Sequence, residues 1–293
     1  MSMELAYFFL AAIMLSDDYF KGKVAIVTGS SSGIGRQTAK MIAVRGAKIV
    51  IIGRPDAKII TDSVEDAKNE ILSAGSKEED IHTIVAELCD PEEQKRIVDE
   101  TIKKFSKLDI LINCAGFVST DLTVLGIQCH IEHFGKMMDI HCKAVILLVQ
   151  AVTPYLIQSK GVIVNVSSLA AMPFVNQVYA YYGAAKAAQD YLTVQMAGHL
   201  IKEGVRVNSV QPGLVSTNIA AGTGMKSAVG ELASKFLETP GCIPAGRLAS
   251  TSDIAKAIIF LADSSQSGYI NGARLPVDGG AHLFNIQLSM ERQ

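Results

Sequence analysis

A tyrosine and a lysine stand four residues apart in Tyr182-Gly-Ala-Ala-Lys186. In a helix this spacing places a phenol and an ammonium group one turn apart on the same face. The unperturbed pKa of a phenol is near ~10, so donating a proton near pH 7 requires that pKa to fall by about 3 units, or ~4 kcal/mol. A nearby cation in a partly dry site shifts the pKa in that direction. The pair is therefore a candidate proton donor with its activating cation.

The spacing alone is weak evidence, because a solvated surface pair shows it too. Tyr182 is nevertheless the preferred candidate among its neighbours, since Tyr179, Tyr181 and Tyr191 have no lysine four residues further on. The function of the pair therefore depends on the segments that the fold brings to it.

Two strand ends flank this pair in the sequence. Upstream, a predicted strand ends at Ser167-Ser168, where the Ser168 hydroxyl would hydrogen-bond a substrate carbonyl oxygen, although serines at strand ends often only cap backbone groups. Downstream, a strand ends at Pro212-Gly213, and that turn would set Val215 and Thr217 against a ligand.

A third segment predicts an anion site. An apolar run at 24–27 leads into a loop of glycines and small hydroxyls, and a helical pattern follows it. Backbone amides and the helix dipole at such a junction attract negative charge, and the missing side chains let a pyrophosphate approach the backbone. A plain glycine-rich connection is the alternative. The residues predicted to hold the pyrophosphate are Gly29, Ser31, Ser32, Gly33, Ile34 and Gly35.

Strands alternate with helices along most of the chain, which predicts a doubly wound parallel sheet of the Rossmann type in a single α/β domain. Ligands in such sheets lie outside the carboxyl ends of the strands. The predicted strands are 24–27, 48–52, 81–85, 109–112, 162–166, 205–210 and 274–277, and the predicted helices are 34–45, 62–74, 92–105, 131–150, 182–202 and 253–262. The residues that follow strand ends, and so should share one crevice, are 29–35, Arg54, Glu87, Asn113, Ser168 and Pro212-Gly213.

Composition sets broad limits on function. The 293 residues are 49% hydrophobic and carry a formal net charge of -2, which suits one globular domain and gives no basic footprint for nucleic acid. Five scattered cysteines indicate reduced thiols. Residues 5–15 are apolar but too short to span a bilayer, and no basic residue precedes Lys21. We therefore expect a cytoplasmic protein whose extension packs on the domain or is mobile, with shallow membrane contact as the lesser alternative.

In order along the chain, these motifs resemble the short-chain dehydrogenase/reductase family in its compact single-domain form, over about residues 20–280. The resemblance implies hydride transfer between a nicotinamide dinucleotide and a carbonyl/alcohol pair, without a metal. It implies that Tyr182 donates or accepts the proton, that Lys186 binds the nicotinamide ribose and lowers the pKa of Tyr182, and that Ser168 orients the carbonyl. The further cofactor contacts that it implies are Asn113, Ala115 and Gly116 beside the ribose, Val215 and Thr217 at the carboxamide, and Glu87 and Leu88 at the adenine.

Four positions depart from the family pattern. Cys114 replaces a second Asn, Glu87 replaces an Asp, and the Ser168–Tyr182 interval is one residue longer than usual, which leaves Ser167 as an alternative. The fourth is His141, which stands where the family has an Asn that anchors a water-mediated proton path to the lysine. A neutral imidazole offers one donor and one acceptor and could hold the same water, so we expect His141 to be neutral at pH 7 and to act in catalysis.

The end of the second strand predicts the cofactor. Choosing NAD requires an acidic residue there for the ribose 2′-hydroxyl. This chain has Gly53 followed by Arg54, and the arginine can face a 2′-phosphate instead, with a solvated loop arginine as the alternative. We therefore expect NADP(H).

The resulting hypothesis is a reductase of an apolar carbonyl substrate that forms a homodimer or homotetramer. We expect an N-terminal extension at 1–19, a catalytic domain at 20–280 with a substrate flap at about 216–246, and a tail at 281–293. A catalytically impaired dinucleotide-binding regulator, suggested by His141, and a membrane-associated lipid or steroid dehydrogenase, suggested by residues 5–15, are the alternatives. A metal cluster of His130, His133 and His141 with nearby cysteines is judged far less probable than helix-surface or core positions.

Overall fold

The computed structural model describes residues 19–55, 63–118, 126–173, 180–216 and 243–283. Several predictions fall outside these ranges and are not addressed by it. They are the apolar segment 5–15 with most of the N-terminal extension, Tyr179, Thr217, most of the flap, and residues 284–293 of the tail.

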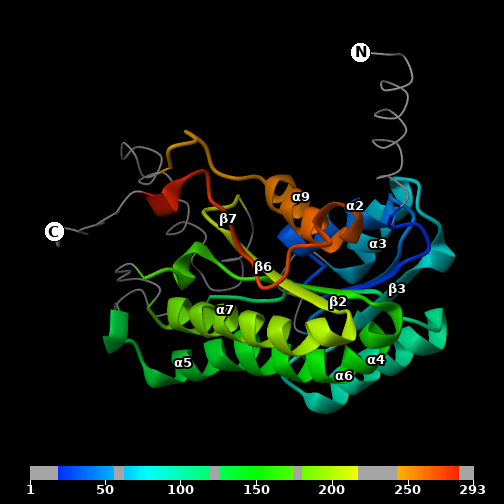
Figure 1. The fold of residues 1–293 in the computed structure, drawn as a ribbon, viewed down its shortest axis with the longest axis horizontal. Helices are drawn as coiled ribbons and strands as arrows, with labels where there is room; N and C mark the ends of the chain where they lie inside the picture. The colour runs from blue at the N-terminus through cyan, green and yellow to red at the C-terminus, as the bar shows by residue number, and fades with distance from the viewer. Residues whose placement is uncertain (1–18, 56–62, 119–125, 174–179, 217–242, 284–293) are drawn as a thin grey trace.

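Seven parallel strands form one sheet in the order β3-β2-β1-β4-β5-β6-β7 (Figure 1). Their bounds are β1 Val24–Val27, β2 Lys48–Gly53, β3 Ile81–Val85, β4 Ile110–Asn113, β5 Val162–Val166, β6 Arg206–Pro212 and β7 Arg274–Val277. Every residue of β1, β4, β5 and β6 is buried, as expected for parallel strands covered on both faces. The predicted doubly wound α/β fold is confirmed.

Helices cover both faces of the sheet and create two separate cores (Figure 1). On one face lie α2 Gly33–Ala43, α3 Val64–Ser73 and α9 Thr251–Ala262, and on the other α4 Pro91–Phe105, α5 Ile131–Met138, α6 Ala144–Ser159 and α7 Ala180–Leu200. The strand order reverses between β1 and β4, which is where a ligand crevice opens in folds of this kind.

The helical region predicted over about 131–150 is present, but it contains a π-helical turn and extends further along the chain. The chain forms α5, then a π-helical turn at Asp139–Lys143, and then α6, which runs on to Ser159. A π-turn adds one residue to the helical repeat and is frequent at functional sites. Here it turns His141 inward, so that the residue is only 1% exposed.

The segment Ile131–Ser159 is also long and apolar enough, by length and composition, to cross a bilayer. Half of its most apolar stretch is buried within the domain, where α6 packs on α4. A core helix has the same length and composition, so this feature is weak evidence for a membrane span.

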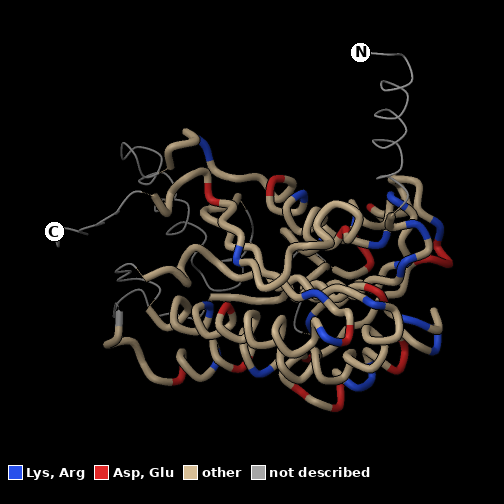
Figure 2. The backbone as a smooth tube through the Cα atoms, in the orientation of Figure 1, with Lys and Arg blue, Asp and Glu red and all other residues tan. Residues whose placement is uncertain are grey.

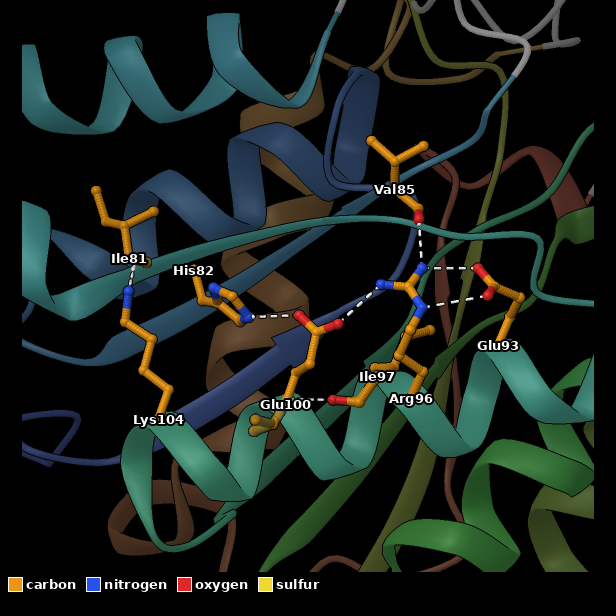
Figure 3. Close-up of polar contacts among 9 residues, drawn as sticks. Ile81, His82, Val85, Glu93, Arg96, Ile97, Glu100 and Lys104 are labelled. Atoms are coloured by element: carbon orange, nitrogen blue, oxygen red, sulfur yellow. Dashed lines mark hydrogen bonds and ion pairs between the residues drawn. The ribbon is translucent and has the colours of Figure 1, made fainter.

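Cationic side chains of α4 cover the edge strand β3 (Figure 3). Arg96 donates to the carbonyl of Val85 at 2.7 Å, and Lys104 donates to that of Ile81 at 2.6 Å. Glu100 accepts from Arg96 at 2.9 Å and keeps that guanidinium in place. Covered carbonyls and charged side chains discourage pairing of an edge strand with another chain.

Candidate active site

The glycine loop after β1 lies directly against the loop after β4. Gly29 has φ +63°, and a Cβ on it would lie 2.7 Å from the Cα of Ala115. A Cβ on Gly35 would overlap the carbonyl oxygen of Gly29. The hydroxyl of Thr28 accepts hydrogen bonds from the amides of Cys114 and Ala115, each at 3.0 Å. Glycine is therefore required for the two loops to form a common floor.

The N-terminus of α2 opens onto this floor. Its N-cap, Ser32, makes no side-chain capping hydrogen bond, and its first turn holds no acidic residue. Uncapped amides and the positive end of the helix dipole are the features that bind a pyrophosphate. The predicted phosphate-binding residues from Gly29 to Gly35 therefore lie together in the expected geometry.

The end of β2 leaves no space for an acidic side chain. A Cβ on Gly53 would lie 2.6 Å from Cγ1 of Val64 and 3.5 Å from the hydroxyl oxygen of Ser31. Arg54 follows as an exposed residue, with its guanidinium carbon 5.9 Å from the ring centre of Phe117. Both Ser31 and Arg54 thus lie beside the position at which dinucleotides of the two types differ.

Glu87 and Leu88 follow β3 as predicted. Glu87 is exposed, and its carboxylate accepts from the amide of Cys89 at 3.1 Å. Leu88 is buried, and its carbonyl accepts from the side chain of Gln94. The same side chain donates to the carbonyl of Ala144 at 3.0 Å, which ties this loop to the start of α6.

The loop after β4 is anchored through the sheet. The side-chain amide of Asn113 donates to the side-chain oxygen of Asn165 at 2.8 Å. The side-chain amide of Asn165 in turn donates to the hydroxyl of Thr193 in α7 at 2.9 Å. Because Asn113 is 4% exposed and bonded in this way, its side chain fixes the loop, whose exposure then increases along the chain to Gly116.

Tyr182 and Lys186 lie in the first two turns of α7. The ammonium of Lys186 is 5.8 Å from the ring centre of Tyr182. Lys186 is only 4% exposed, and it donates to the carbonyl of Val166 at 2.8 Å and to the side-chain oxygen of Gln189 at 3.0 Å. Burial lowers the pKa of Lys186 to about 8, against opposing effects of Cys114 and Asp190. A cation is thus held beside the phenol in a dry environment.

The two serines after β5 have different surroundings. Ser167 is buried, and its hydroxyl points to the backbone carbonyl of Lys186 at 3.4 Å. Ser168 is half-buried, and its hydroxyl oxygen caps the short helix 169–171 by accepting from the amide of Ala170 at 3.1 Å. This capping bond leaves the hydroxyl proton of Ser168 available to a ligand, so Ser168 rather than Ser167 suits the predicted role.

His141 reaches the site from the π-turn. Its Nε2 lies 3.0 Å from the carbonyl oxygen of Phe117, and its ring packs against Gly116, where a Cβ would overlap it. Nδ1 is buried and has no hydrogen-bond partner among the described residues. Burial and the charge of Lys186 lower the pKa of His141 well below its ordinary value of 6.5, although the bond to Phe117 opposes this. The imidazole is therefore neutral at pH 7, with Nε2–H as the donor and Nδ1 as a lone-pair acceptor.

Tyr181 is occupied elsewhere. Its hydroxyl lies 2.9 Å from the carbonyl of Ile127 and 3.0 Å from that of Cys129, and its ring meets Phe134 edge-on. It joins α7 to the segment that precedes α5. Its proton is therefore bound to backbone, which makes Tyr181 poorly suited to acid chemistry.

The remaining predicted contacts lie at the end of β6. Val215 is half-buried and forms a parallel bridge with Ala249. Gly213 allows the close approach of Asp278, since a Cβ on it would lie 2.8 Å from the Cα of that residue. Within the described part of the chain, no three His, Cys, Asp or Glu side chains are arranged to hold a metal ion.

With this geometry established, the chain can be compared with known proteins. The family model described as enoyl-(acyl carrier protein) reductase matches residues 29–282. The chain is 30% identical over 262 residues to the 3-oxoacyl-[acyl-carrier-protein] reductase FabG of Thermotoga maritima, which covers 89% of this chain and 98% of that protein. The chain belongs to the short-chain dehydrogenase/reductase family. The family predicted from the motifs is confirmed.

Two solved structures of the family align along most of the chain. A short-chain dehydrogenase/reductase of unknown function from Caenorhabditis elegans, solved with its cofactor, is 38% identical, with a TM-score of 0.85 and coverage of 90% of this chain and 97% of that one. A gluconate 5-dehydrogenase assigned as putative from Beutenbergia cavernae, with bound NADP, is 28% identical, with a TM-score of 0.75 and coverage of 90% and 98%. The chain is therefore an oxidoreductase of the carbonyl/alcohol type.

Two features of the site were not predicted from the sequence. Gln189 contacts the ammonium of Lys186, and the carbonyl of Phe117 receives His141. Gln189 stands three residues after Lys186, a spacing that places both on one helix face and could have identified it. No local signal identifies the Phe117 carbonyl, because that contact joins residues 24 positions apart.

Proposed function

We propose that the protein is an NADP(H)-dependent reductase of a carbonyl compound, with Tyr182 as the proton donor. The observation that carries the proposal is the buried ammonium of Lys186, held 5.8 Å from the Tyr182 ring at the carboxyl end of β5. A fixed cation in a dry site favours the phenolate, which lowers the pKa of the phenol toward the working range.

The preference for NADP(H) rests on the end of β2. An acidic residue at Gly53 would require the side chain of Val64 to move, which disfavours the usual ligand of an NAD ribose at this position. Arg54 follows Gly53 directly and carries a guanidinium, and the hydroxyl of Ser31 lies near Gly53. The bound NADP of the Beutenbergia cavernae relative is consistent with this cofactor.

A dinucleotide bound here would supply the hydride. Backbone amides of the loop from Gly29 to Gly35 would hold its pyrophosphate, and Lys186 would bind its nicotinamide ribose. Glu87 and Leu88 would lie at the adenine, and Asn113, Ala115 and Gly116 beside the ribose. Val215 and Thr217 would contact the carboxamide, although Thr217 lies outside the described residues.

The chain's own groups complete the reduction. The Ser168 hydroxyl donates a hydrogen bond to the substrate carbonyl oxygen and orients it. The phenol of Tyr182 then gives its proton to that oxygen as the carbonyl carbon is reduced, and the ammonium of Lys186 stabilises the phenolate left behind. In the opposite direction, Tyr182 accepts the proton of the alcohol.

His141 takes the place of the family's Asn in the proton path. Its neutral imidazole packs against the Tyr182 ring and has a buried lone pair on Nδ1, to which a water molecule could donate. His141 is therefore assigned a catalytic role through that water.

Substrate and assembly follow from less specific features. The apolar composition of the flap favours an apolar carbonyl substrate. Tyr191, Val194 and Ile201 are exposed on and just after α7, and half of the most apolar stretch of α5–α6 is not buried within the chain. Exposed apolar side chains of this kind suit contacts between subunits, so we infer a homodimer or homotetramer. We infer that the enzyme is cytoplasmic.

The departure at His141 also supports a second candidate, a dinucleotide-binding regulator with impaired catalysis. A screen of carbonyl compounds, followed by NADPH oxidation at 340 nm, separates the two. The reductase predicts turnover of at least one apolar ketone or aldehyde. NADPH binding without turnover of any compound in a broad panel would favour the regulator.

A further inference from the structure

Gln189 lies one helical turn after Lys186, on the same face of α7. It is 1% exposed, and its side-chain oxygen accepts a hydrogen bond from the ammonium of Lys186 at 3.0 Å. Among the described residues, the other acceptor is the carbonyl of Val166, at 2.8 Å. Two of the three N–H groups of this lysine are thus engaged by protein oxygens rather than by water.

A buried ammonium is stable as a cation only where oxygen acceptors replace the water that it has lost. The carbonyl of Val166 is fixed by β5 in any sequence that folds this way. Gln189 is different, because an apolar side chain of similar length would fill the same space and leave the ammonium with one protein acceptor fewer. The chemical nature of residue 189 therefore affects the charge of the lysine.

We propose that Gln189 is a positioning residue that holds the buried ammonium of Lys186 in its cationic form. The expected effect on turnover rests on the proposed function. The effect on the lysine does not, because it requires only that the side-chain oxygen at position 189 stabilises the cationic form of Lys186.

Other ionisable groups surround this lysine and act on it as well. They come from the loop after β4, from the π-turn and from α7 itself, and they are Cys114, His141, Cys142, Tyr182 and Asp190. All of them stay unchanged when residue 189 is replaced, so a substitution there isolates the contribution of the glutamine.

The test is a pH titration of Lys186 by NMR in the full chain, with lysine labelled with ¹³C at Cε. The resonance of Lys186 is assigned by its loss in Lys186→Arg. Gln189→Met keeps the length of the side chain and removes the oxygen, whereas Gln189→Glu keeps an oxygen and adds a negative charge. Thr101→Val is the matched control, since Thr101 is a fully buried residue of α4 whose hydroxyl donates to the Ile97 carbonyl of its own helix.

The wild-type lysine should titrate near pH 8. Gln189→Met should lower the midpoint by about 1 pH unit, which matches the loss of one hydrogen bond to a charged group. Gln189→Glu should raise the midpoint, and Thr101→Val should leave it unchanged. The alkaline limb of kcat/KM should move with each midpoint. If Gln189→Met does not fold, an unchanged midpoint in Gln189→Glu would still overturn the inference.

Unchanged midpoints in the folded Gln189 variants would overturn the inference, even for an enzyme that turns over carbonyl compounds. The absence of any turnover in the wild type would instead count against the proposed function, while the titration would still decide the role of Gln189.

Discussion

The imidazole of His141 meets the phenol ring of Tyr182 edge-on, with ring centroids 5.3 Å apart and planes at 79°. The residue that replaces the family's Asn therefore touches the proposed acid directly. The π-turn at Asp139–Lys143 makes this contact, because it directs His141 into the domain. A substitution at His141 therefore acts on Tyr182 through packing as well as through hydrogen bonds.

The first prediction concerns activity at His141. His141→Asn should retain turnover, because an amide can donate to the Phe117 carbonyl and accept from a water. His141→Ala should slow turnover by ~10²- to 10⁴-fold, the effect typical of losing an acid–base element. The wild type should also lose activity at acid pH, on a limb that His141→Asn removes. The measurement is kcat as a function of pH for the three proteins, and identical profiles would mean that the imidazole only fills space.

The second prediction concerns stability against pH. The pKa of His141 is lowered well below 6.5 in the folded protein, so below pH 6.5 the unfolded chain binds a proton that the folded chain does not. The free energy of unfolding should therefore fall as pH drops through 6.5, by up to ~1.4 kcal/mol for each pH unit from this residue. Thermal unfolding at pH 7.5 and 5.5 should show a smaller loss in His141→Asn. His199→Asn, at an exposed position of α7, is the control and should behave as the wild type does.

The third prediction concerns cofactor choice. Arg54→Ala should weaken NADPH binding by about 10- to 100-fold, the equivalent of one charge-assisted hydrogen bond, and leave NADH binding nearly unchanged. Lys202→Ala removes an exposed positive charge before β6, at the opposite end of the strands, and should change neither affinity. Dissociation constants from the fluorescence of the reduced dinucleotides provide the test. Equal wild-type affinities for NADH and NADPH would refute the assignment.

The fourth prediction uses the contact between Gly53 and Val64. Gly53→Asp alone should weaken binding of both dinucleotides, because its Cβ would lie 2.6 Å from Val64 and push the β2 end out of place. Adding Val64→Ala removes that obstacle, and the double variant should bind NADH more tightly than Gly53→Asp does. Equal NADH affinities of the single and double variants would show that the space at Val64 does not limit the acidic residue.

The strands and loops that position the site can be predicted from the sequence for physical reasons. Buried parallel strands are short apolar runs, so the predicted bounds of the strands at 24–27, 81–85, 162–166 and 274–277 match the structure. The loops that follow strand ends must meet at one edge of a parallel sheet, and this brings the glycine loop to the loop after β4.

The features that the sequence does not predict depend on contacts between distant residues. A π-turn changes the helical repeat by a single residue, which the hydrophobic pattern of 131–150 does not reveal. The bond between Lys186 and Gln189 depends on side-chain rotamers. The different surroundings of Ser167 and Ser168 also depend on the fold, because burial rather than spacing distinguishes them.

The central claim is that Tyr182 donates the proton. The most direct test is single-turnover oxidation of bound NADPH by the best carbonyl of the screen, in wild type, Tyr182→Phe and Tyr181→Phe. Both substitutions remove one hydroxyl from neighbouring residues of α7, but the Tyr181 hydroxyl bonds the carbonyls of Ile127 and Cys129. We expect Tyr182→Phe to bind NADPH almost as the wild type does and to show no turnover, and Tyr181→Phe to remain active. Substantial turnover in Tyr182→Phe would contradict the claim.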